Sequence, residues 1–533
     1  MWKQKNSENG ITLVALVVTV IVLIILAAVS ISLVLGDHGI LKMARDAKIK
    51  SEKVNVIENA QMDIWAKKAE NDGNNITEDE LVEILEKYGV LSENGGTSVL
   101  DKILTTAKGG YEIEVKEIYN GELAEPNLTP GLYKTGTNEM IKSWEELIGE
   151  KIFQVSETGE LQRDTGYAAD KLDGKLVIHP DVKSLYSGVL SESAITGLVL
   201  PEGVTELKDG VMYNCIKLTS VNIPTSVTLI SNGAFSGCTS LKSIKIPDSV
   251  QTLTSGAFSS CTGLVYIKIG KGVTNCSGYP FGGSTAKKEL VIDSPSCLTK
   301  DFIISCGNLV DLTIGDSITN IPDYNTQAIN NIETLKIGKN VSTIGSSAFQ
   351  NCKGLKEVNI PGNVKTIKDF AFSGCENIEK LNIGNGVNSI EKWAFATCKK
   401  IKEIELPDSI TSLGTEYTFG MCENLERIKL SNNLTEIPYS SFIQCNKLTS
   451  IVLPDSVTKI VKYGFSSCTN LESVEIPTSV TYMDSYLFFN CNKLNTIKYL
   501  GTKAQWDAIT KDSGWKTSSV ITKVQCTDGE YDI

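Results

Sequence analysis

Hydrophobic residues recur with a period near 23 residues over the C-terminal two-thirds of the chain, and Cys352–Gly374, CKGLKEVNIPGNVKTIKDFAFSG, shows the pattern. With Cys352 as position 0, aliphatic residues stand at +3, +6 and +8, a second apolar pair at +12 and +15, and Phe372 at +20. The alternation of Val358 and Ile360 is typical of a strand with one buried face. Pro361 follows at +9, where the missing N–H is expected to end the strand.

These columns repeat in register along the chain. The cysteine column contains Cys215, Cys238, Cys261, Cys352, Cys375, Cys398, Cys422, Cys445, Cys468 and Cys491. The phenylalanine column contains Phe235, Phe258, Phe281, Phe349, Phe372, Phe395, Phe419, Phe442, Phe465 and Phe488, out of 14 Phe in the chain. One unit cannot bury these residues alone, whereas stacked units share a continuous core. The pattern predicts a repeat solenoid with a β-strand per turn over residues 166–500, in about 14 turns.

The unit Cys445–Ser467 has the motif C-x-x-L-x-x-I-x-L-P-x-S-V-x-x-I-x-x-x-x-F-x-x. This motif resembles the BspA-like leucine-rich repeats of bacterial surface proteins, and the resemblance covers roughly residues 170–500. It implies a horseshoe or gently curved solenoid that serves adhesion or protein binding, and it transfers no catalytic residue.

The N-terminal region is organised differently. Residues Ile11–Leu35 form a run of 25 residues without a charge, and about 20 apolar residues suffice to span a bilayer as a helix. We therefore expect a leader at 1–10, a long transmembrane α-helix at 11–35 and a helical stalk at 36–71. The stalk is either a helix that packs on neighbouring subunits or a solvated juxtamembrane segment.

Gly10 stands immediately before Ile11-Thr12-Leu13-Val14 at the start of this run. The junction resembles the prepilin-type leader of type IV pilins and pseudopilins, which implies cleavage after Gly10 and Ile11 as the mature N-terminus. That family usually has Glu at the fifth mature position, where this chain has Ala15. The difference puts a major-pilin role in doubt and suits a minor subunit.

Charge gives a conflicting indication of topology. Basic residues are more numerous after the run than before it, so the positive-inside rule alone would place the leader outside. The leader resemblance implies the opposite orientation, with a single-pass anchor in the cell membrane and the repeat domain extracellular. We adopt the second interpretation, because a large domain can be translocated regardless of charge.

Three further segments complete the expected organisation. A small helix-plus-strand subdomain is predicted at 72–122, with a capping box beginning at Thr77, a helix to Tyr88 and a strand over 111–119. A Pro- and Gly-bearing linker is predicted at 123–165. Residues 501–533 are expected to form a C-terminal cap, with a helix bearing Trp506 and Ile509 over the last turn.

Composition limits the classes of function that the sequence favours. The net charge of −12 argues against a nucleic-acid partner, which calls for a basic surface. The only histidines, His38 and His179, are far apart in sequence, so no Ser-His or Cys-His pair is expected within the repeats. The column cysteines are interpreted as small buried hydrophobes, while the redox state of Cys276, Cys297 and Cys526 stays open. We expect no enzymatic activity, no metal and no cofactor.

Positions +5 and +7 flank the buried strand residues and should face solvent. The candidate binding face consists of Tyr266, Lys268, Glu357, Asn359, Lys380, Asn382, Glu403, Glu405, Arg427 and Lys429. This face is either a protein-recognition surface or an ordinary solvated sheet.

The sequence thus favours a non-enzymatic, membrane-tethered surface protein that displays a solenoid for adhesion or protein binding. Its expected partners are the membrane, through Ile11–Leu35, and an unknown extracellular protein or host ligand. The alternative is a minor pilin or pseudopilin subunit of a type IV pilus, secretion or DNA-uptake machine. In that case other pilin-like subunits would be partners and the repeats would form a tip module.

Overall fold

The structure is a computed structural model that describes residues 78–87, 89–92, 103–106, 112–114, 128–135, 139–164, 169–284, 286–323 and 330–533. The chain forms two compact units, 1–128 and 129–533. The predicted leader, Gly10, Ile11, the span Ile11–Leu35 and the stalk 36–71 lie outside the described residues. Within the described ranges, no helix combines the length and the apolar character needed to cross a membrane.

The described part of the first unit contains one helix and three strands. Helix α3 (Glu78–Glu86) buries Leu81, Ile84 and Leu85, which lie on one face of the helix. Strands β1 (Gly89–Ser92), β2 (Ile103–Thr106) and β3 (Glu112–Glu114) follow as an antiparallel sheet in the order β1-β2-β3. The predicted strand at 111–119 corresponds to β3, whereas β1 and β2 were not predicted.

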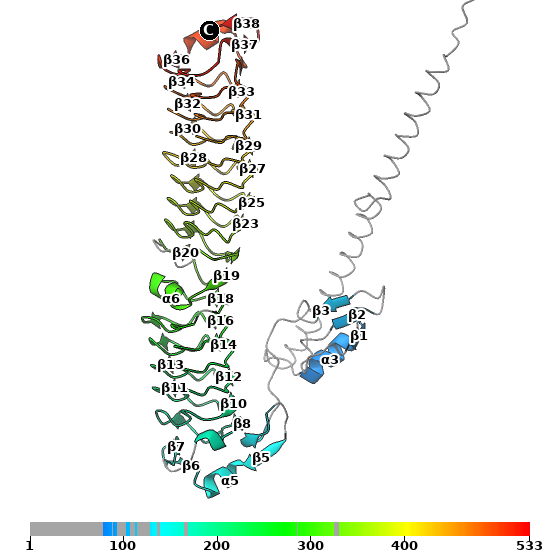
Figure 1. The fold of residues 1–533 in the computed structure, drawn as a ribbon, viewed down its shortest axis with the longest axis vertical. Coiled ribbons are helices and arrows are strands. Elements are labelled where there is room, and N and C mark those ends of the chain that lie inside the picture. The colour runs from blue at the N-terminus through cyan, green and yellow to red at the C-terminus, as the bar shows by residue number, and fades with distance from the viewer. Residues whose placement is uncertain are drawn as a thin grey trace, which may run out of the picture. The chain divides into compact units, whose positions relative to one another are not determined.

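The second unit is a column of stacked turns, and each regular turn contributes two strands (Figure 1). The longer strand of each turn lies around positions +5 to +8, as predicted. Within each of several successive sheets these strands pair in parallel. These strands are β8 (Gly174–Val177), β10 (Ile195–Val199), β12 (Ser220–Asn222), β14 (Ser243–Ile246), β16 (Tyr266–Ile269), β18 (Lys288–Ile292), β19 (Leu309–Ile314), β21 (Thr334–Lys336), β23 (Glu357–Ile360), β25 (Lys380–Ile383), β27 (Glu403–Glu405), β29 (Arg427–Lys429), β31 (Ser450–Val452), β33 (Ser473–Ile476), β35 (Thr496–Tyr499) and β37 (Lys523–Cys526).

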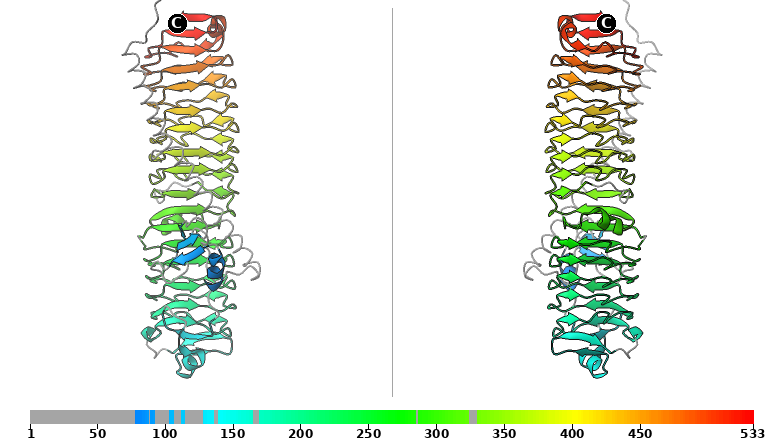
Figure 2. Two further views of the ribbon diagram at one scale, coloured as in Figure 1. Left: turned by 90° about the vertical axis from the view of Figure 1, so that its right-hand side faces the viewer. Right: turned by 90° about the vertical axis from the view of Figure 1, so that its left-hand side faces the viewer.

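The shorter strand of each turn covers positions +14 and +15 and was not predicted. Two residues suffice because the apolar residue at +15 points into the core while its polar neighbour stays outside. These strands are β9 (Ser184–Leu185), β11 (Glu206–Leu207), β13 (Leu229–Ile230), β15 (Thr252–Leu253), β17 (Asn275–Cys276), β20 (Asn320–Ile321), β22 (Thr343–Ile344), β24 (Thr366–Ile367), β26 (Ser389–Ile390), β28 (Ser412–Leu413), β30 (Glu436–Ile437), β32 (Lys459–Ile460), β34 (Tyr482–Met483) and β36 (Thr510–Lys511). The column shows little curvature in the two side views of Figure 2.

One continuous core fills the space between the two strand stacks. The column cysteines are fully buried, and neighbouring rings of the phenylalanine column stack at centroid distances of 4.8–6.0 Å. In the irregular unit before Cys306, helix α6 (Lys300–Ser305) replaces the short strand, and Phe302 contacts Phe281 edge-on at 5.7 Å. The irregular units therefore keep the core filled by a different local structure.

Residues 129–164 form the N-terminal end of the column instead of a linker. Strand β4 (Gly131–Tyr133) pairs antiparallel with β8 and with β5 (Met140–Ser143), which extends the longer-strand sheet. Strands β6 (Phe153–Val155) and β7 (Glu160–Arg163) form a hairpin against β9 and extend the shorter-strand sheet. Helix α5 (Trp144–Gly149), capped by Ser143, buries Trp144 and Leu147, and the 3₁₀ helix η2 (Ala169–Lys171) precedes β8. Burial of these apolar residues explains why the segment is ordered against the first turn.

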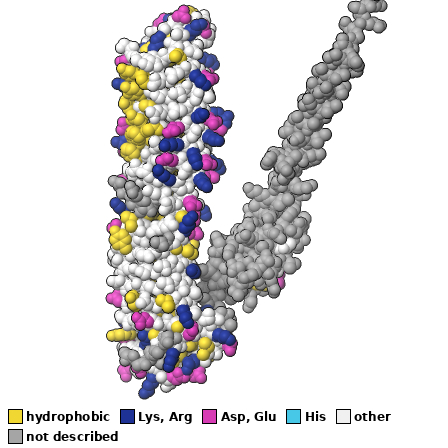
Figure 3. All heavy atoms as spheres, viewed as in Figure 1, with side chains coloured by type: hydrophobic (Ala, Val, Ile, Leu, Met, Phe, Trp, Pro, Cys, Tyr) yellow, Lys and Arg dark blue, Asp and Glu magenta, His cyan; other side chains and the backbone are white. Residues whose placement is uncertain are grey.

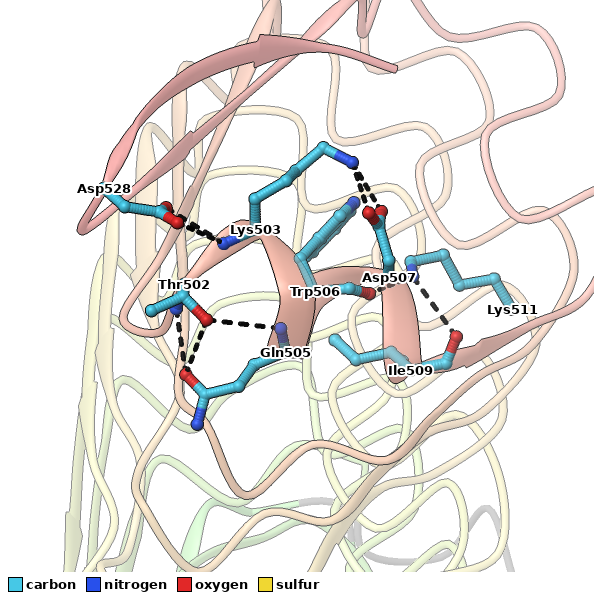
Figure 4. A network of polar contacts seen from close by, with 8 residues as sticks. All are labelled: Thr502, Lys503, Gln505, Trp506, Asp507, Ile509, Lys511 and Asp528. Carbon is cyan, nitrogen blue, oxygen red and sulfur yellow. Dashed lines mark hydrogen bonds and ion pairs between the residues drawn. The ribbon is translucent and has the colours of Figure 1, made fainter.

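The C-terminal end contains the predicted helix, α7 (Lys503–Ala508), with Trp506 buried. Figure 4 shows how polar contacts fix this helix: Thr502 and Gln505 form a capping box, and Lys503 reaches Asp507 at 2.6 Å. Both sheets continue past residue 500, because β36 pairs with β34 and β37 pairs with β35. The column ends at the antiparallel partner of β37, β38 (Gly529–Asp532).

Candidate functional site

The longer strands place the predicted candidate binding face on the surface. In β23 and β25 the +5 and +7 side chains are exposed while the residue at +6 is buried. Lys380 and Asn382 therefore follow Glu357 and Asn359 directly along the column, in register. The alternation required for an exposed face is confirmed, whereas a binding role is not tested by it.

Oppositely charged residues alternate from one strand to the next on this face. Lys380 Nζ lies 2.8 Å from Glu357 Oε1, and Lys429 Nζ lies 2.5 Å from Glu405 Oε1. Arg427 forms an ion pair with Glu403 beside the second of these pairs. Because the strands are parallel and in register, residues one turn apart stand opposite each other and can form such cross-strand pairs.

These contacts shift the pKa values of Glu357, Arg427 and Lys429. The hydrogen bond from Lys380 lowers the pKa of Glu357, and a second hydrogen bond from Asn359 acts in the same direction. Hydrogen bonds to Glu403 and Glu405 raise the pKa values of Arg427 and Lys429, respectively. The ion pairs leave the face with mixed charge, with both signs interspersed.

The charged rows border a shallow hollow of about 700 Å³ across β25, β27 and β29. Its polar lining contains six residues of the candidate binding face: Lys380, Asn382, Glu403, Glu405, Arg427 and Lys429. A smaller hollow of about 350 Å³ adjoins it and shares Arg427 and Lys429. Figure 3 shows that Lys, Arg, Asp and Glu side chains gather along this side of the column.

The structure does not bring the whole predicted set together. Glu357 and Asn359 lie on β23, next to β25, so eight of the ten predicted residues are contiguous. Tyr266 and Lys268 lie on β16, which is separated from β23 by β18, β19 and β21. We therefore define the charged face as the exposed residues of β23, β25, β27 and β29.

The charged face presents paired charges. Its acids are each paired with a base, so they offer no free carboxylate couple for proton transfer. Within the described ranges, no group of three His, Cys, Asp or Glu side chains is placed to hold a metal ion. His179 lies against Trp144 at the N-terminal end of the column, with ring centroids 6.0 Å apart, far along the chain from the charged face.

The cysteines contribute to the core. Burial raises the pKa of Cys261, Cys422 and Cys491 to about 12, so these thiols stay protonated and unreactive at neutral pH. Of the three cysteines whose redox state the sequence left open, Cys297 and Cys526 are buried and Cys276 is partly exposed. The side chains of Cys276 and Cys297 are hydrogen-bonded to each other, and this bond raises the pKa of Cys276.

The repeat pattern matches a known family. The model of the BspA type leucine rich repeat region matches residues 174–288, 297–416 and 394–508, in six copies. The chain belongs to the BspA-type leucine-rich repeat family. The matched residues include the charged face and most of both strand stacks.

Solved structures of leucine-rich repeat proteins are similar to this chain. A leucine rich cell surface protein from Faecalibacterium prausnitzii is 25% identical over 68% of this chain and 96% of its own, with a TM-score of 0.30. Leucine-rich repeat proteins from Bacteroides ovatus and Eubacterium ventriosum are 22% and 21% identical. They cover 70% and 71% of this chain and 97% and 96% of their own, with TM-scores of 0.34 and 0.35. No curated protein matches the sequence.

Proposed function

We propose that this BspA-type protein is a non-enzymatic surface protein that holds its solenoid outside the cell and binds a protein partner through the charged face. The observation that carries the proposal is the hollow across β25, β27 and β29, bordered by alternating charges. The residues stand on in-register strands over a continuous core, so their positions are fixed before a partner arrives.

The chemistry of the charged face favours a protein over other partners. Glu403, Glu405, Arg427 and Lys429 place both signs of charge side by side, which suits a protein surface with complementary charges. A phosphate polymer would instead call for an excess of positive charge. The exposed columns of these four strands contain no aromatic side chain on which a base could stack.

The tether is the second part of the proposal. The uncharged run Ile11–Leu35 is long enough to span a bilayer, and we propose a single-pass anchor in the cell membrane with residues 129–533 extracellular. Protease added to intact cells should then degrade the repeat domain while a cytoplasmic control protein survives. Protection of the repeat domain until the cells are lysed would contradict this orientation.

Binding through the charged face can be tested on cells that produce the full chain. Adherence to an epithelial cell layer should fall strongly for Glu405→Lys, because the substitution places two cations together beside the hollow. It should also be lost when the layer is treated with trypsin, since the partner is a protein. The matched control is Glu376→Lys, which reverses another exposed, paired acid away from the charged face.

Two outcomes would count against this site. If Glu405→Lys and Glu376→Lys reduce adherence equally, the effect belongs to net charge and not to the charged face. If adherence survives trypsin treatment of the layer but not removal of its glycans, the partner is a carbohydrate.

The alternative proposal is a minor pilin or pseudopilin subunit with the repeats as a tip module. The observation that favours it is Gly10 before the Ile11 run, although Ala15 replaces the usual Glu. Sequencing the mature N-terminus distinguishes the two proposals, since cleavage before Ile11, abolished by Gly10→Ala, is required for assembly. An uncut chain that still reaches the surface would leave only the tethered form.

A further inference from the structure

A second surface feature lies on the other side of the column, where the turns follow the shorter strands. Figure 3 shows hydrophobic side chains gathered there over the C-terminal half. The aromatic ridge consists of Phe370, Trp393, Tyr417, Tyr439, Tyr463, Tyr486 and Phe489, each partly exposed. Successive rings along it lie 4.1–6.1 Å apart.

The backbone does not require aromatic residues at this place. Trp393 and Tyr463 have positive φ values of 58° and 60°, and the N–H of Trp393 donates to the carbonyl oxygen of Glu416 in the next turn at 3.1 Å. Equivalent positions in N-terminal turns hold Gly210 and Gly233, which adopt the same conformation without a side chain. This conformation is energetically less favourable for an aromatic residue than for glycine. The aromatic choice in the C-terminal half therefore calls for an explanation other than the turn itself.

The ring geometry limits what the ridge can bind. Trp393 and Tyr417 stack at 4.1 Å with an interplanar angle of 18°, and Tyr463 and Tyr486 stack at 5.3 Å and 22°. Stacked rings cover each other's faces and leave mainly their edges accessible. A nucleobase or a sugar ring needs a free aromatic face on which to lie, whereas ring edges pack well against other aromatic rings in a protein interface.

The ridge is symmetric about Tyr439 over two turns in each direction. Trp393 and Tyr417 lie in the two turns before it and Tyr463 and Tyr486 in the two turns after it, and the ring of Tyr439 lies across its neighbours, at 62° to Tyr417 and 88° to Tyr463. A twofold axis near Tyr439 would therefore place the first half of one ridge against the second half of another.

Charged residues beside the ridge would also be complementary across this twofold axis. Glu416 lies in the turn before Tyr439 and Lys462 lies in the turn after it, where Nζ stands 5.3 Å from the Tyr463 ring centroid. An antiparallel pair of chains would bring Glu416 of one copy opposite Lys462 of the other.

We propose that the aromatic ridge binds a second copy of this chain in an antiparallel, twofold-symmetric pair centred near Tyr439. Such isologous contacts are the commonest mode of self-association. Each ring keeps most of its surface against its own neighbours, so the ridge adds only a small area and the association is weak. Antiparallel pairing puts the N-terminal ends of the two columns at opposite ends of the pair. If the proposed membrane tether holds, the pair would join two apposed cell surfaces.

Charge reversal tests the pairing on residues 129–533, a compact unit that contains the whole solenoid core. Sedimentation of this fragment at rising micromolar concentration should show a monomer–dimer equilibrium. Glu416→Lys and Lys462→Glu should each weaken it at least tenfold, because each places like charges opposite one another. The double variant should restore it, since the opposite charges then face each other with their places exchanged.

A cross-linking experiment tests the orientation. Tyr439→Cys lies on the proposed twofold axis and should form a disulfide-linked dimer under mild oxidation, whereas Tyr486→Cys should not, because it would face Trp393. Efficient self-linking of both variants would indicate parallel pairing and overturn the proposal. A wild-type fragment that stays monomeric, or a double variant as weak as the single ones, would also overturn it. Each of these failures leaves binding at the charged face untouched.

Discussion

The thiol of Cys468 donates a hydrogen bond of 3.1 Å to the carbonyl oxygen of Phe442, which is 26 residues earlier and stands one turn before the column residue Phe465. The same relationship joins Cys491 to Phe465 and Cys375 to Phe349. The two most regular columns of the repeat are thereby linked: the cysteine that follows one column phenylalanine by three residues contacts the backbone at the phenylalanine one turn earlier. The cysteine is thus both a filler of the core and a polar link between turns.

This link predicts the effect of substitutions at Cys468. Cys468→Ala should destabilise the protein by roughly 1–2 kcal/mol, because it leaves a small cavity and removes the thiol donor. Cys468→Val should cost less, since it fills the space and the Phe442 carbonyl retains its bond from the Cys445 N–H. Urea unfolding of both variants measures the difference, and a larger loss for Val than for Ala would contradict the packing argument.

The phenylalanine column should matter more than any single cysteine. Phe419 is fully buried and stacks on Phe395 at 5.6 Å and on Phe442 at 6.0 Å. Phe419→Ala should cost roughly 3–5 kcal/mol, the usual range for removing a buried phenylalanine. Since each turn contacts only its neighbours, limited proteolysis should cut first near the altered turn. The control is Phe489→Ala, which removes a partly exposed ring and should cost markedly less.

The columns explain why much of this fold could be predicted from the sequence. Val358, Ile360 and Phe372 recur in register, and each repeat repeats the same physical constraint, so the longer strand, the buried cysteine and the stacked phenylalanine were all predicted correctly. The shorter strands were missed because two residues such as Thr366 and Ile367 carry no periodic signal of their own. The end of the column at 129–164 was missed because its turn residues, Pro130 and Gly131, are also those of a linker.

The surface was less predictable for a different reason. The exposed columns were correctly placed on one side, but the pairing of Glu403 with Arg427 depends on strand register that a single sequence does not state. The aromatic ridge had a visible signal, since Trp393 and Tyr463 each stand two residues before a column phenylalanine. In other turns the same position holds glycine. Only the shared backbone conformation shows that the aromatic and the glycine positions are equivalent.

The buried thiols predict a loss of stability at alkaline pH. Burial raises the pKa of Cys422 to about 12, whereas an exposed thiol in the unfolded chain titrates near pH 8.5. The folded state then holds protons that the unfolded state releases, so stability is complete below about pH 8.5 and falls as pH rises toward 12. Each such thiol contributes a slope of about 1.4 kcal/mol per pH unit within that window.

A comparison of two proteins isolates this effect from other groups that titrate in the same range. The urea midpoints of the wild type and of Cys422→Val should converge as the pH rises from neutral toward about 10, because only the wild type loses this thiol's contribution. Curves that stay parallel across this range would show that the Cys422 thiol does not control alkaline stability.

Two glycines should respond differently to alanine, because different constraints act on them. Gly233 has a φ of 64° and an added Cβ would have open space, with Ser236 Cβ the nearest atom at 3.8 Å. Gly233→Ala should therefore cost only about 1 kcal/mol of conformational strain. Gly414, in the turn that carries one extra residue, has no such strain, but an added Cβ would lie 2.0 Å from the backbone nitrogen of Lys392. Gly414→Ala should cost roughly 2–3 kcal/mol, because two turns of backbone must move apart.

Thermal unfolding of the two alanine variants and of Gly233→Asn measures this contrast. Asparagine tolerates positive φ better than alanine does, so Gly233→Asn should recover part of the loss at that position. An asparagine at Gly414 should recover nothing, since the clash there comes from the Cβ atom itself. If Gly233→Ala proves more damaging than Gly414→Ala, conformational strain would outweigh close packing between turns. The turn with the extra residue would then be looser than its backbone contacts indicate.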